Sequence, residues 1–296
     1  MAFNWSTFWT RAFTALIFVA VMMFGLLYSK WSLFLLISVI HFGCWWEFFR
    51  LVEKKQNISI HPYAKLGWCL LGYHFFIWLA AGDLRLLGYG VKESFSLPFL
   101  LAGCILTVWG IFNTKRINSA VVVWCIGGLA YISVSLGLLV NIVDTVDLHT
   151  YQGPVKIPGS HVALFIIGSV WVNDTMAYLG GSVIGKTPLS KISPKKTWEG
   201  TITGIILSAA LTWLLYSLIF LKGVFGAIAP AGIAISAIAA ISGTFGDLFE
   251  SKLKRMAGVK DSGRIMPGHG GFLDRFDSVL FAAPAVWLFI RIFLLK

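Results

Sequence analysis

The stretch HVALFIIGSVWVNDTMAYLGG, residues 161–181, decides what kind of protein this sequence encodes. Its apolar residues extend over about 20 positions, the length that an α-helix needs to cross a bilayer. Asn173 and Asp174 interrupt the run toward one end. An ionisable side chain in a spanning helix is costly and usually faces a polar cavity or a partner. We therefore expect Asp174 to serve a functional site, with a structural hydrogen bond inside a helix bundle as the alternative.

The rest of the chain has the same apolar character. Of its 296 residues, 57% are hydrophobic and 12% are charged, whereas about 25% of residues are charged in soluble domains. The mean hydropathy is +0.80. Such a chain cannot cover a globule with polar surface, so most of its surface must face hydrocarbon. The four cysteines lie singly in apolar runs without a CxxC pair, which argues against a disulfide framework or a zinc knuckle.

The predicted fold class is an all-α polytopic membrane protein of about nine transmembrane helices. About five spans form an N-terminal region, residues 1–160, and the others form a catalytic region, residues 161–296. The first span follows Arg11 without a small-x-small cleavage site, so we expect it to be retained. The predicted spans are 12–28, 31–50, 66–82, 96–112, 119–140, 161–181, 201–221, 225–246 and 276–295.

The charges of the loops predict an orientation. If all nine segments span the membrane, seventeen of the 24 basic residues lie on one side. The positive-inside rule then places the N-terminus in the cytosol and the C-terminus outside. The same bias attracts anionic lipid head groups. It does not explain two inside loops, on either side of residues 201–246, that mix carboxylates and glycines among the bases.

The first of these loops contains two motifs. GGSVIGKT, residues 180–187, matches the phosphate-loop pattern, but a spanning helix precedes it and Pro188 follows, so we exclude an NTPase phosphate loop. Backbone N–H groups beside Lys186 could still approach a phosphate. In SPKKTWEG, residues 193–200, Ser-Pro favours a turn, and Lys195 and Lys196 suit a polyphosphate. The alternative is a basic loop that caps the next span.

The second inside loop begins with GDLFESKLKR, residues 246–255. Its polar residues Asp247, Glu250, Ser251, Lys254 and Arg255 are spaced to share one helix face. A carboxylate followed by two cations suits a metal–phosphate complex, although basic residues also complete the dipole of a helix end.

KDSGRIMPGHGGFLDRFD, residues 260–277, adds three more carboxylates and one His. Carboxylates with few soft ligands favour Mg²⁺ over zinc. The residues therefore indicate a cytosol-facing site for Mg²⁺ and a polyphosphate. Glu47, in the second span, is expected to reach the inside surface or to pair with Arg50.

SKLKRMAGVKDSGRIMPGHGGFLDRFD, residues 251–277, closely resembles the signature of phosphatidate cytidylyltransferases, also called CDP-diacylglycerol synthases. NDTMAYLGGSVIGKTPLSKISPKKTWEG, residues 173–200, is also similar to that family. The resemblance implies the reaction CTP + phosphatidate → CDP-diacylglycerol + pyrophosphate in phospholipid biosynthesis. It also implies that the protein is a homodimer in a bacterial inner membrane and that the enzyme requires Mg²⁺. By the same resemblance, Asp247 and Asp274 lie at a metal centre that K⁺ can share. We expect no nucleic-acid partner.

The candidate residues are divided by expected role. Asp247 and Asp274 would hold the metal, and Lys254 and Arg255 would neutralise phosphate charge during catalysis. A larger set is expected to bind substrate or order the glycine loop: Asp174, Lys186, Ser193, Lys195, Lys196, Thr197, Glu199, Ser251, Lys260, Asp261, His269, Gly270, Gly271, Arg275 and Asp277.

Two other functions are compatible with parts of this pattern. A CTP-dependent lipid kinase would phosphorylate a lipid alcohol and release CDP. A transporter would line a path with its intramembrane charges, but the chain has no inverted repeat and its polar residues gather on one side.

Overall fold

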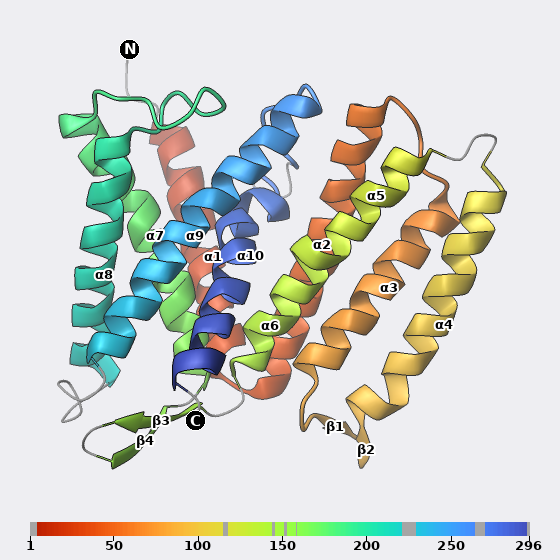
Figure 1. Cartoon of the computed structure of the whole chain (residues 1–296), viewed down its shortest axis with the longest axis horizontal. Coiled ribbons are helices and arrows are strands. Elements are labelled where there is room, and N and C mark those ends of the chain that lie inside the picture. Colours follow the sequence, from red (N-terminus) through yellow and green to blue (C-terminus); the bar gives the residue numbers. More distant parts are fainter. Residues whose placement is uncertain are drawn as a thin grey trace. The chain divides into compact units, whose positions relative to one another are not determined.

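The computed structural model describes residues 5–114, 118–143, 146–150, 153–157, 159–220, 229–263 and 270–294. Helices make up most of this part of the chain (Figure 1). Two antiparallel hairpins complete it, β1 (Arg85–Leu86) with β2 (Tyr89–Gly90), and β3 (Val146–Thr150) with β4 (Gly153–Ile157). The helices are α1 (Trp5–Leu27), α2 (Lys30–Gln56), α3 (Pro62–Ala80), α4 (Val91–Phe112), α5 (Ser119–Gly128), η1 (Leu129–Val134), α6 (Ser135–Asn141), α7 (Gly159–Ile184), α8 (Trp198–Phe220), α9 (Ala229–Met256), α10 (Phe272–Phe289) and η2 (Ile290–Leu294).

The all-α class is confirmed apart from the two hairpins. The segments α5, η1 and α6 form one continuous helix, as do α10 and η2, so the described ranges contain nine continuous helices. Each coincides with one of the nine predicted segments. Seven of them are long and apolar enough to cross a membrane, whereas α1 has a shorter apolar part, Ala12–Leu27, and α3 is outside this set. In α3 the polar ends of Tyr, His and Trp side chains and Lys65 lower the hydropathy.

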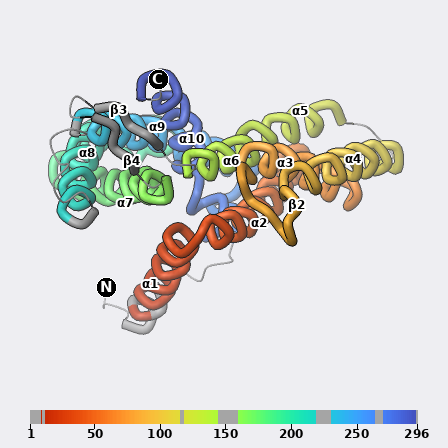
Figure 2. Tube along the Cα trace, turned by 90° about the horizontal axis from the view of Figure 1, so that it is seen from below, coloured from red at the N-terminus to blue at the C-terminus, as the bar shows by residue number. Residues whose placement is uncertain are grey.

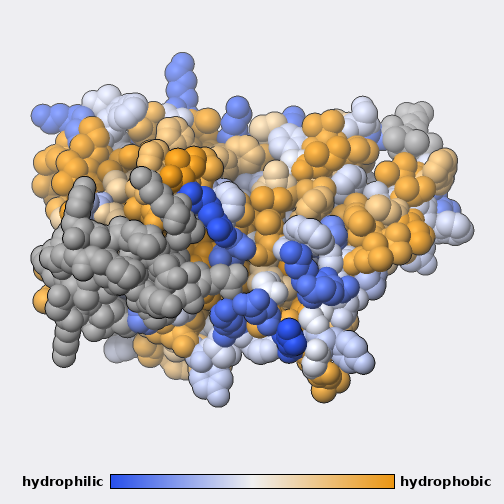
Figure 3. All heavy atoms as spheres, turned by 60° about the horizontal axis from the view of Figure 1, so that its bottom comes forward, coloured by the Kyte–Doolittle hydropathy of each residue, from blue (hydrophilic) through white to orange (hydrophobic). Residues whose placement is uncertain are grey.

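The surface of α4 shows what surrounds such a helix. Large apolar side chains recur along it every three or four residues and are more than half exposed: Leu97, Leu101, Ile105, Val108 and Phe112. A stripe of this length would be an aggregation liability in water and is the expected lipid-facing side of a membrane helix. Hydrophobic side chains open to the surface are visible in Figure 3. The chain is therefore an integral membrane protein.

The chain forms two compact units. Unit 1 comprises residues 1–141 and 253–276, and unit 2 comprises residues 142–252 and 277–296. In unit 1, η1 is a π-helical turn that places Ser133 against α2. The Ser133 hydroxyl accepts a hydrogen bond from Trp45 Nε1 at 2.9 Å and also bonds to His41 Nε2 at 2.9 Å. All three side chains are buried, so this hydroxyl satisfies two polar groups that the apolar core cannot.

In unit 1, α3 and α4 lie side by side in both ribbon views (Figures 1 and 2). Glycines allow the close approach. A Cβ on Gly110 would lie 2.3 Å from the Ala64 nitrogen, and one on Gly67 would lie 2.4 Å from the Thr107 nitrogen. Small residues at helix contacts are typical of membrane bundles, in which packing and not water exclusion drives association.

In unit 2, α8 packs against α7 through small residues one turn apart. A Cβ on Gly200 would lie 2.6 Å from the Ala177 carbonyl oxygen, and one on Gly204 would lie 2.9 Å from that of Asn173. One turn further, the Ser208 hydroxyl donates to the Ser169 carbonyl at 2.7 Å. These contacts fix the middle and second half of α7 beside the first half of α8.

Replacement of Gly110 by Ala tests the α3–α4 contact. The new methyl group has no space beside the α3 backbone, so we expect Gly110→Ala to destabilise the protein by about 1–3 kcal/mol and to lower its thermal unfolding midpoint in detergent. Gly127→Ala is the matched control because a Cβ there meets nothing within 4 Å, and it should be neutral or mildly stabilising. Equal midpoints for the two variants would contradict this packing.

Candidate active site

A pocket of about 480 Å³ in unit 2 gathers many of the predicted residues. Helix α7 contributes Asp174, the loop before α8 contributes four residues, and α9 contributes Asp247. Asp174 is exposed, so it faces this polar cavity, as its position in an apolar helix predicts. The other predicted residues that line the pocket are Ser193, Lys195, Lys196 and Thr197.

A second cavity, of about 570 Å³, lies in unit 1 near the start of α3, the end of α4 and the start of α5. Its walls are mostly apolar, with residues such as Trp68 and Ile111, and among the described residues that line it there is no Asp, Glu, Lys or Arg. A phosphate site needs cations or a metal, so the smaller pocket in unit 2 is the better candidate despite its size.

The loop between α7 and α8 has a defined backbone structure. The Lys196 N–H donates to the Ser193 carbonyl at 3.0 Å, which closes a turn with Pro194 at its second position. Pro pre-sets the backbone angle required there. The Leu189 N–H donates to the Lys196 carbonyl at 2.7 Å, and Trp198 N–H donates to Thr187 at 2.9 Å. The turn predicted from Ser-Pro is thereby confirmed, and it presents Lys195 and Lys196 at the pocket.

Glu199 holds the other end of this loop. Its carboxylate accepts hydrogen bonds from the Lys186 N–H at 3.1 Å and from the Thr187 N–H at 3.1 and 3.2 Å. These are the N–H groups predicted to suit a phosphate, and here they donate to a side chain in the first turn of α8. Helix α7 extends to Ile184, so a helix precedes Lys186, as expected. Glu199 thus shapes the loop in this structure, and its predicted contact with substrate stays a prediction.

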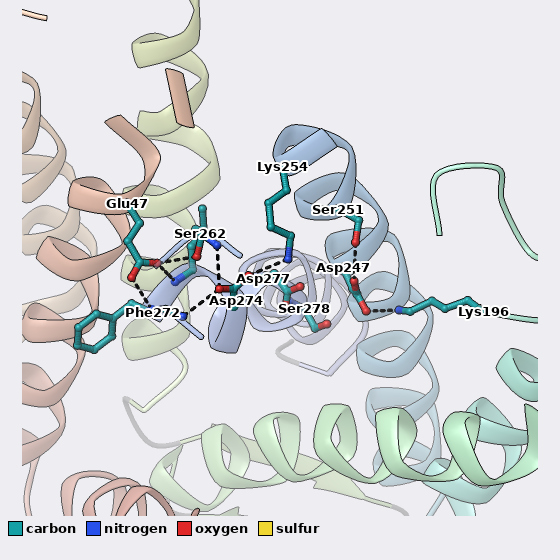
Figure 4. A network of polar contacts seen from close by, with 12 residues as sticks. Glu47, Lys196, Asp247, Ser251, Lys254, Ser262, Phe272, Asp274, Asp277 and Ser278 are labelled. Atoms are coloured by element: carbon teal, nitrogen blue, oxygen red, sulfur yellow. Dashed lines mark hydrogen bonds and ion pairs between the residues drawn. The ribbon is translucent and has the colours of Figure 1, made fainter. Parts of the chain in front are cut away.

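Asp247 forms an ion pair with Lys196 (Figure 4). Its Oδ1 also accepts a hydrogen bond from the Ser251 hydroxyl at 3.2 Å. The Lys196 and Asp247 side chains are 28% and 26% exposed, so a ligand in the pocket can reach both. The pair joins the SPKK turn to α9, two segments that are fifty residues apart in sequence.

Asp274 lies in the first turn of α10, in unit 1, and accepts three hydrogen bonds (Figure 4). Lys254 Nζ lies 2.7 Å from Oδ1. The N–H groups of Ser262 and Gly271 donate to Oδ2 at 3.0 and 2.9 Å. Gly271 precedes the helix and Asp274 is its third residue, so this last bond is half of a capping box. The Lys254 and Asp274 side chains are only 15% and 11% exposed.

Glu47 corrects a prediction. It neither reaches the surface nor pairs with Arg50, because it is fully buried, while Arg50 is exposed and its guanidinium lies 5.3 Å from the centre of the Trp46 ring. The Glu47 carboxylate instead accepts hydrogen bonds from Ser262, Phe272 and Leu273. An ionisable residue inside a span already indicated that Glu47 needs a polar partner. Its partners could not be identified from the sequence, because they are more than 200 positions away.

The other predicted residues occupy different environments. The five residues of GDLFESKLKR that were predicted to share a face are helical, but Glu250 is fully buried and Arg255 is exposed, so they do not face one common space. Gly270 has a φ of +85°, which only glycine adopts without strain. His269 lies outside the described residues. Lys186, Lys260 and Asp261 are exposed, Arg275 is half-buried, and Asp277 is buried and accepts the Ser278 N–H at 2.6 Å.

The two predicted metal ligands differ in how well they fit an ion. Among the residues that the structure describes, no three His, Cys, Asp or Glu side chains lie together as a metal cluster. Asp247 fits Mg²⁺, which binds one or two carboxylates and completes its shell with water and substrate phosphates. Both carboxylates already have protein partners, but Asp274 is the less accessible of the two: its side chain is 11% exposed, against 26% for Asp247, and Lys254 and two backbone N–H groups occupy its oxygens.

The fold defines an integral membrane protein with a pocket lined by lysines and aspartates. Comparison with known proteins identifies its family. The chain matches the model of the cytidylyltransferase family over residues 9–293. It belongs to this family. The predicted resemblance is thereby confirmed.

Similar proteins carry the name phosphatidate cytidylyltransferase. One from Synechocystis is 30% identical, over 96% of this chain and 97% of its own length. One from Helicobacter pylori is 35% identical, over 74% of this chain and 80% of its own length. A chloroplastic relative from Arabidopsis thaliana is 45% identical, but the match covers 45% of this chain and only 33% of that relative.

Replacement of Glu199 by Gln tests its structural role. An amide has one oxygen that accepts hydrogen bonds, whereas a carboxylate has two. In the variant, the N–H groups of Lys186 and Thr187 therefore keep at most one acceptor oxygen between them. We expect the peptide containing them to exchange amide hydrogen about three to ten times faster, measured by mass spectrometry in detergent. Lys191→Gln, at an exposed position of the same loop, should leave the rate unchanged. Unchanged exchange in Glu199→Gln would assign the carboxylate a different role.

Proposed function

We propose that this chain transfers the CMP group of CTP to phosphatidate, giving CDP-diacylglycerol and pyrophosphate. Relatives matched over most of their length carry the name of that activity. The observation that carries the proposal is the pocket in unit 2, in which two carboxylates, Asp174 and Asp247, come together with two lysines, Lys195 and Lys196. A nucleoside triphosphate and a phosphorylated lipid both need such positive charge.

The reaction needs no nucleophile from the protein. A phosphatidate oxygen is already an anion at neutral pH, because the second pKa of a phosphate monoester is about 6. It attacks the α-phosphorus of CTP, a new P–O bond forms, and the bond from that phosphorus to the bridging oxygen breaks. Pyrophosphate leaves with the electron pair. The protein's contribution is positioning and charge stabilisation, for which Lys195 and Lys196 are placed at the pocket.

We also propose that the reaction requires Mg²⁺ and that Asp247 is its protein ligand. The ion would neutralise triphosphate charge and leave the lysines for the remaining phosphate oxygens. Lys196, now paired with Asp247, would turn to a phosphate when substrate enters. The assignment of Asp274 as a second ligand, and K⁺ as a second cation, remain predictions.

The predicted orientation completes the proposal. With nine crossings and the basic loops inside, the loop that carries Lys195 and Lys196 faces the cytosol, where CTP is found. Two relatives are bacterial proteins, which supports a location in a bacterial inner membrane. The family resemblance implies a homodimer, and mass measurement of the detergent-solubilised protein tests that.

The product of CTP turnover decides between this activity and a lipid kinase. With CTP labelled at the α-phosphorus, phosphatidate and Mg²⁺, we expect the label to enter a lipid band on thin-layer plates, with release of pyrophosphate. Removal of divalent ions by EDTA should stop the reaction, and added Mg²⁺ should restore it. Label that remains in CDP would indicate a kinase and overturn the proposal.

Neutral replacements test the two aspartates. We expect Asp247→Asn and Asp274→Asn each to lower turnover by about a hundredfold or more, while the amount of protein in the membrane fraction stays the same. Asp83→Asn is the control, since Asp83 is an exposed residue of the α3–α4 connection and should retain full turnover. Full activity of the Asp247 variant would refute the metal assignment.

A further inference from the structure

The start of α10 lacks the side chain that usually caps a helix. The first N–H groups of a helix have no partner within it, and Ser, Thr, Asp or Asn at the preceding position normally accepts from them. Here that position is Gly271. Glu47 of α2 accepts from the first two helical N–H groups instead, Phe272 to Oε1 at 3.0 Å and Leu273 to Oε2 at 2.8 Å. Figure 4 shows its carboxylate at the start of α10.

The Glu47 carboxylate occupies the space that a capping side chain at position 271 would need. A Cβ on Gly271 would lie 2.2 Å from both Glu47 oxygens, and one on Gly263 would lie 2.0 Å from Oε1. Glu47 is completely buried, so its negative charge depends on these donors and on the positive end of the α10 dipole. The Glu47 carboxylate can therefore occupy this position only because residues 263 and 271 are glycines.

Glu47 and Asp274 hold the same backbone. Ser262 donates its hydroxyl to Glu47 Oε2 at 2.7 Å and its N–H to Asp274 Oδ2 at 3.0 Å. Glu47 fixes the N–H groups that follow Gly271, and Asp274 accepts the N–H of Gly271 itself. Asp274 in turn holds Lys254 at 2.7 Å. A displacement of Glu47 would thus be transmitted to the Lys254–Asp274 pair.

We propose that Glu47 is a positioning residue, which caps α10 from another helix and thereby sets the geometry of Asp274 and Lys254 for cytidylyl transfer. This inference rests on the proposed function for its effect on turnover. Its effect on Lys254 does not depend on that function.

Three variants separate this role from simple stabilisation. Glu47→Gln preserves shape but turns an N–H₂ group toward at least one donor. Glu47→Asp preserves the charge on a shorter side chain. Glu53→Gln is the matched control, since Glu53 is also in α2 and accepts a loop N–H, that of Ile60 at 2.8 Å, with Lys65 Nζ at 2.7 Å. Neither of these two partners of Glu53 is among the described residues that contact Asp274.

Turnover and amine labelling are then measured on the purified full-length protein. For Glu47→Gln we expect kcat to fall about 10- to 100-fold while KM for CTP changes less than about threefold. Labelling of Lys254 by an amine-reactive reagent, followed by mass spectrometry, should rise several-fold. Glu47→Asp should recover part of the kcat, and Glu53→Gln should match the parent protein in kcat and in Lys254 labelling.

A double-mutant cycle supplies the last test. Ser262→Ala should lower kcat, and its combination with Glu47→Gln should lower kcat little further, because both changes break one network. Additive effects, or Glu47→Gln with unchanged kcat and Lys254 labelling, would overturn the proposal. If Glu47→Gln fails to fold, Ser262→Ala and Glu47→Asp give the same readouts. If the parent protein does not turn over CTP, the proposed function fails, and Lys254 labelling still decides the role of Glu47.

Discussion

Backbone N–H groups without a partner in a helix or sheet need another acceptor, and at three places in the described part of this chain a carboxylate provides it. Glu53 accepts the Ile60 N–H, Glu199 accepts those of Lys186 and Thr187, and Glu47 accepts those of Phe272 and Leu273. Glu53 and Glu199 act within a connection between consecutive helices, and Glu47 acts at the start of a distant helix; at all three places the backbone lacks a regular hydrogen-bonding partner. The protein has only 13 acidic residues, so a substantial part of its negative charge holds backbone in place.

This constraint explains which parts of the structure were predictable. Helix positions follow from the length of apolar runs, and the turn at Ser193 follows from proline stereochemistry, because both depend on neighbours in sequence. The roles of carboxylates depend on distant partners. Glu199 lies within a family motif and was expected to contact substrate, whereas thirteen residues upstream it finds the N–H of Lys186. Glu47 was misjudged for the same reason at much longer range.

The candidate site shows the same division. Its residue types and the joint presence of Asp247, Lys195 and Lys196 could be predicted from motifs and resemblance. The pairing of Lys196 with Asp247 could not, because it depends on how close α7, α8 and α9 approach one another. Gly200 and Gly204 set the distance between α7 and α8. A side chain there would separate α7 from α8 and move Asp174 away from the loop lysines.

The π-helical turn Leu129–Val134 has a consequence for comparing relatives. A π turn holds one more residue than an α turn, so the helix after it is rotated by about 100° relative to a regular continuation. That rotation allows Ser133 to face Trp45 while the apolar residues of α6 also remain buried. A homologue with an uninterrupted α-helix here would need one residue fewer. A single-residue gap at this point of an alignment would therefore record a change in helix geometry and not a shortened loop.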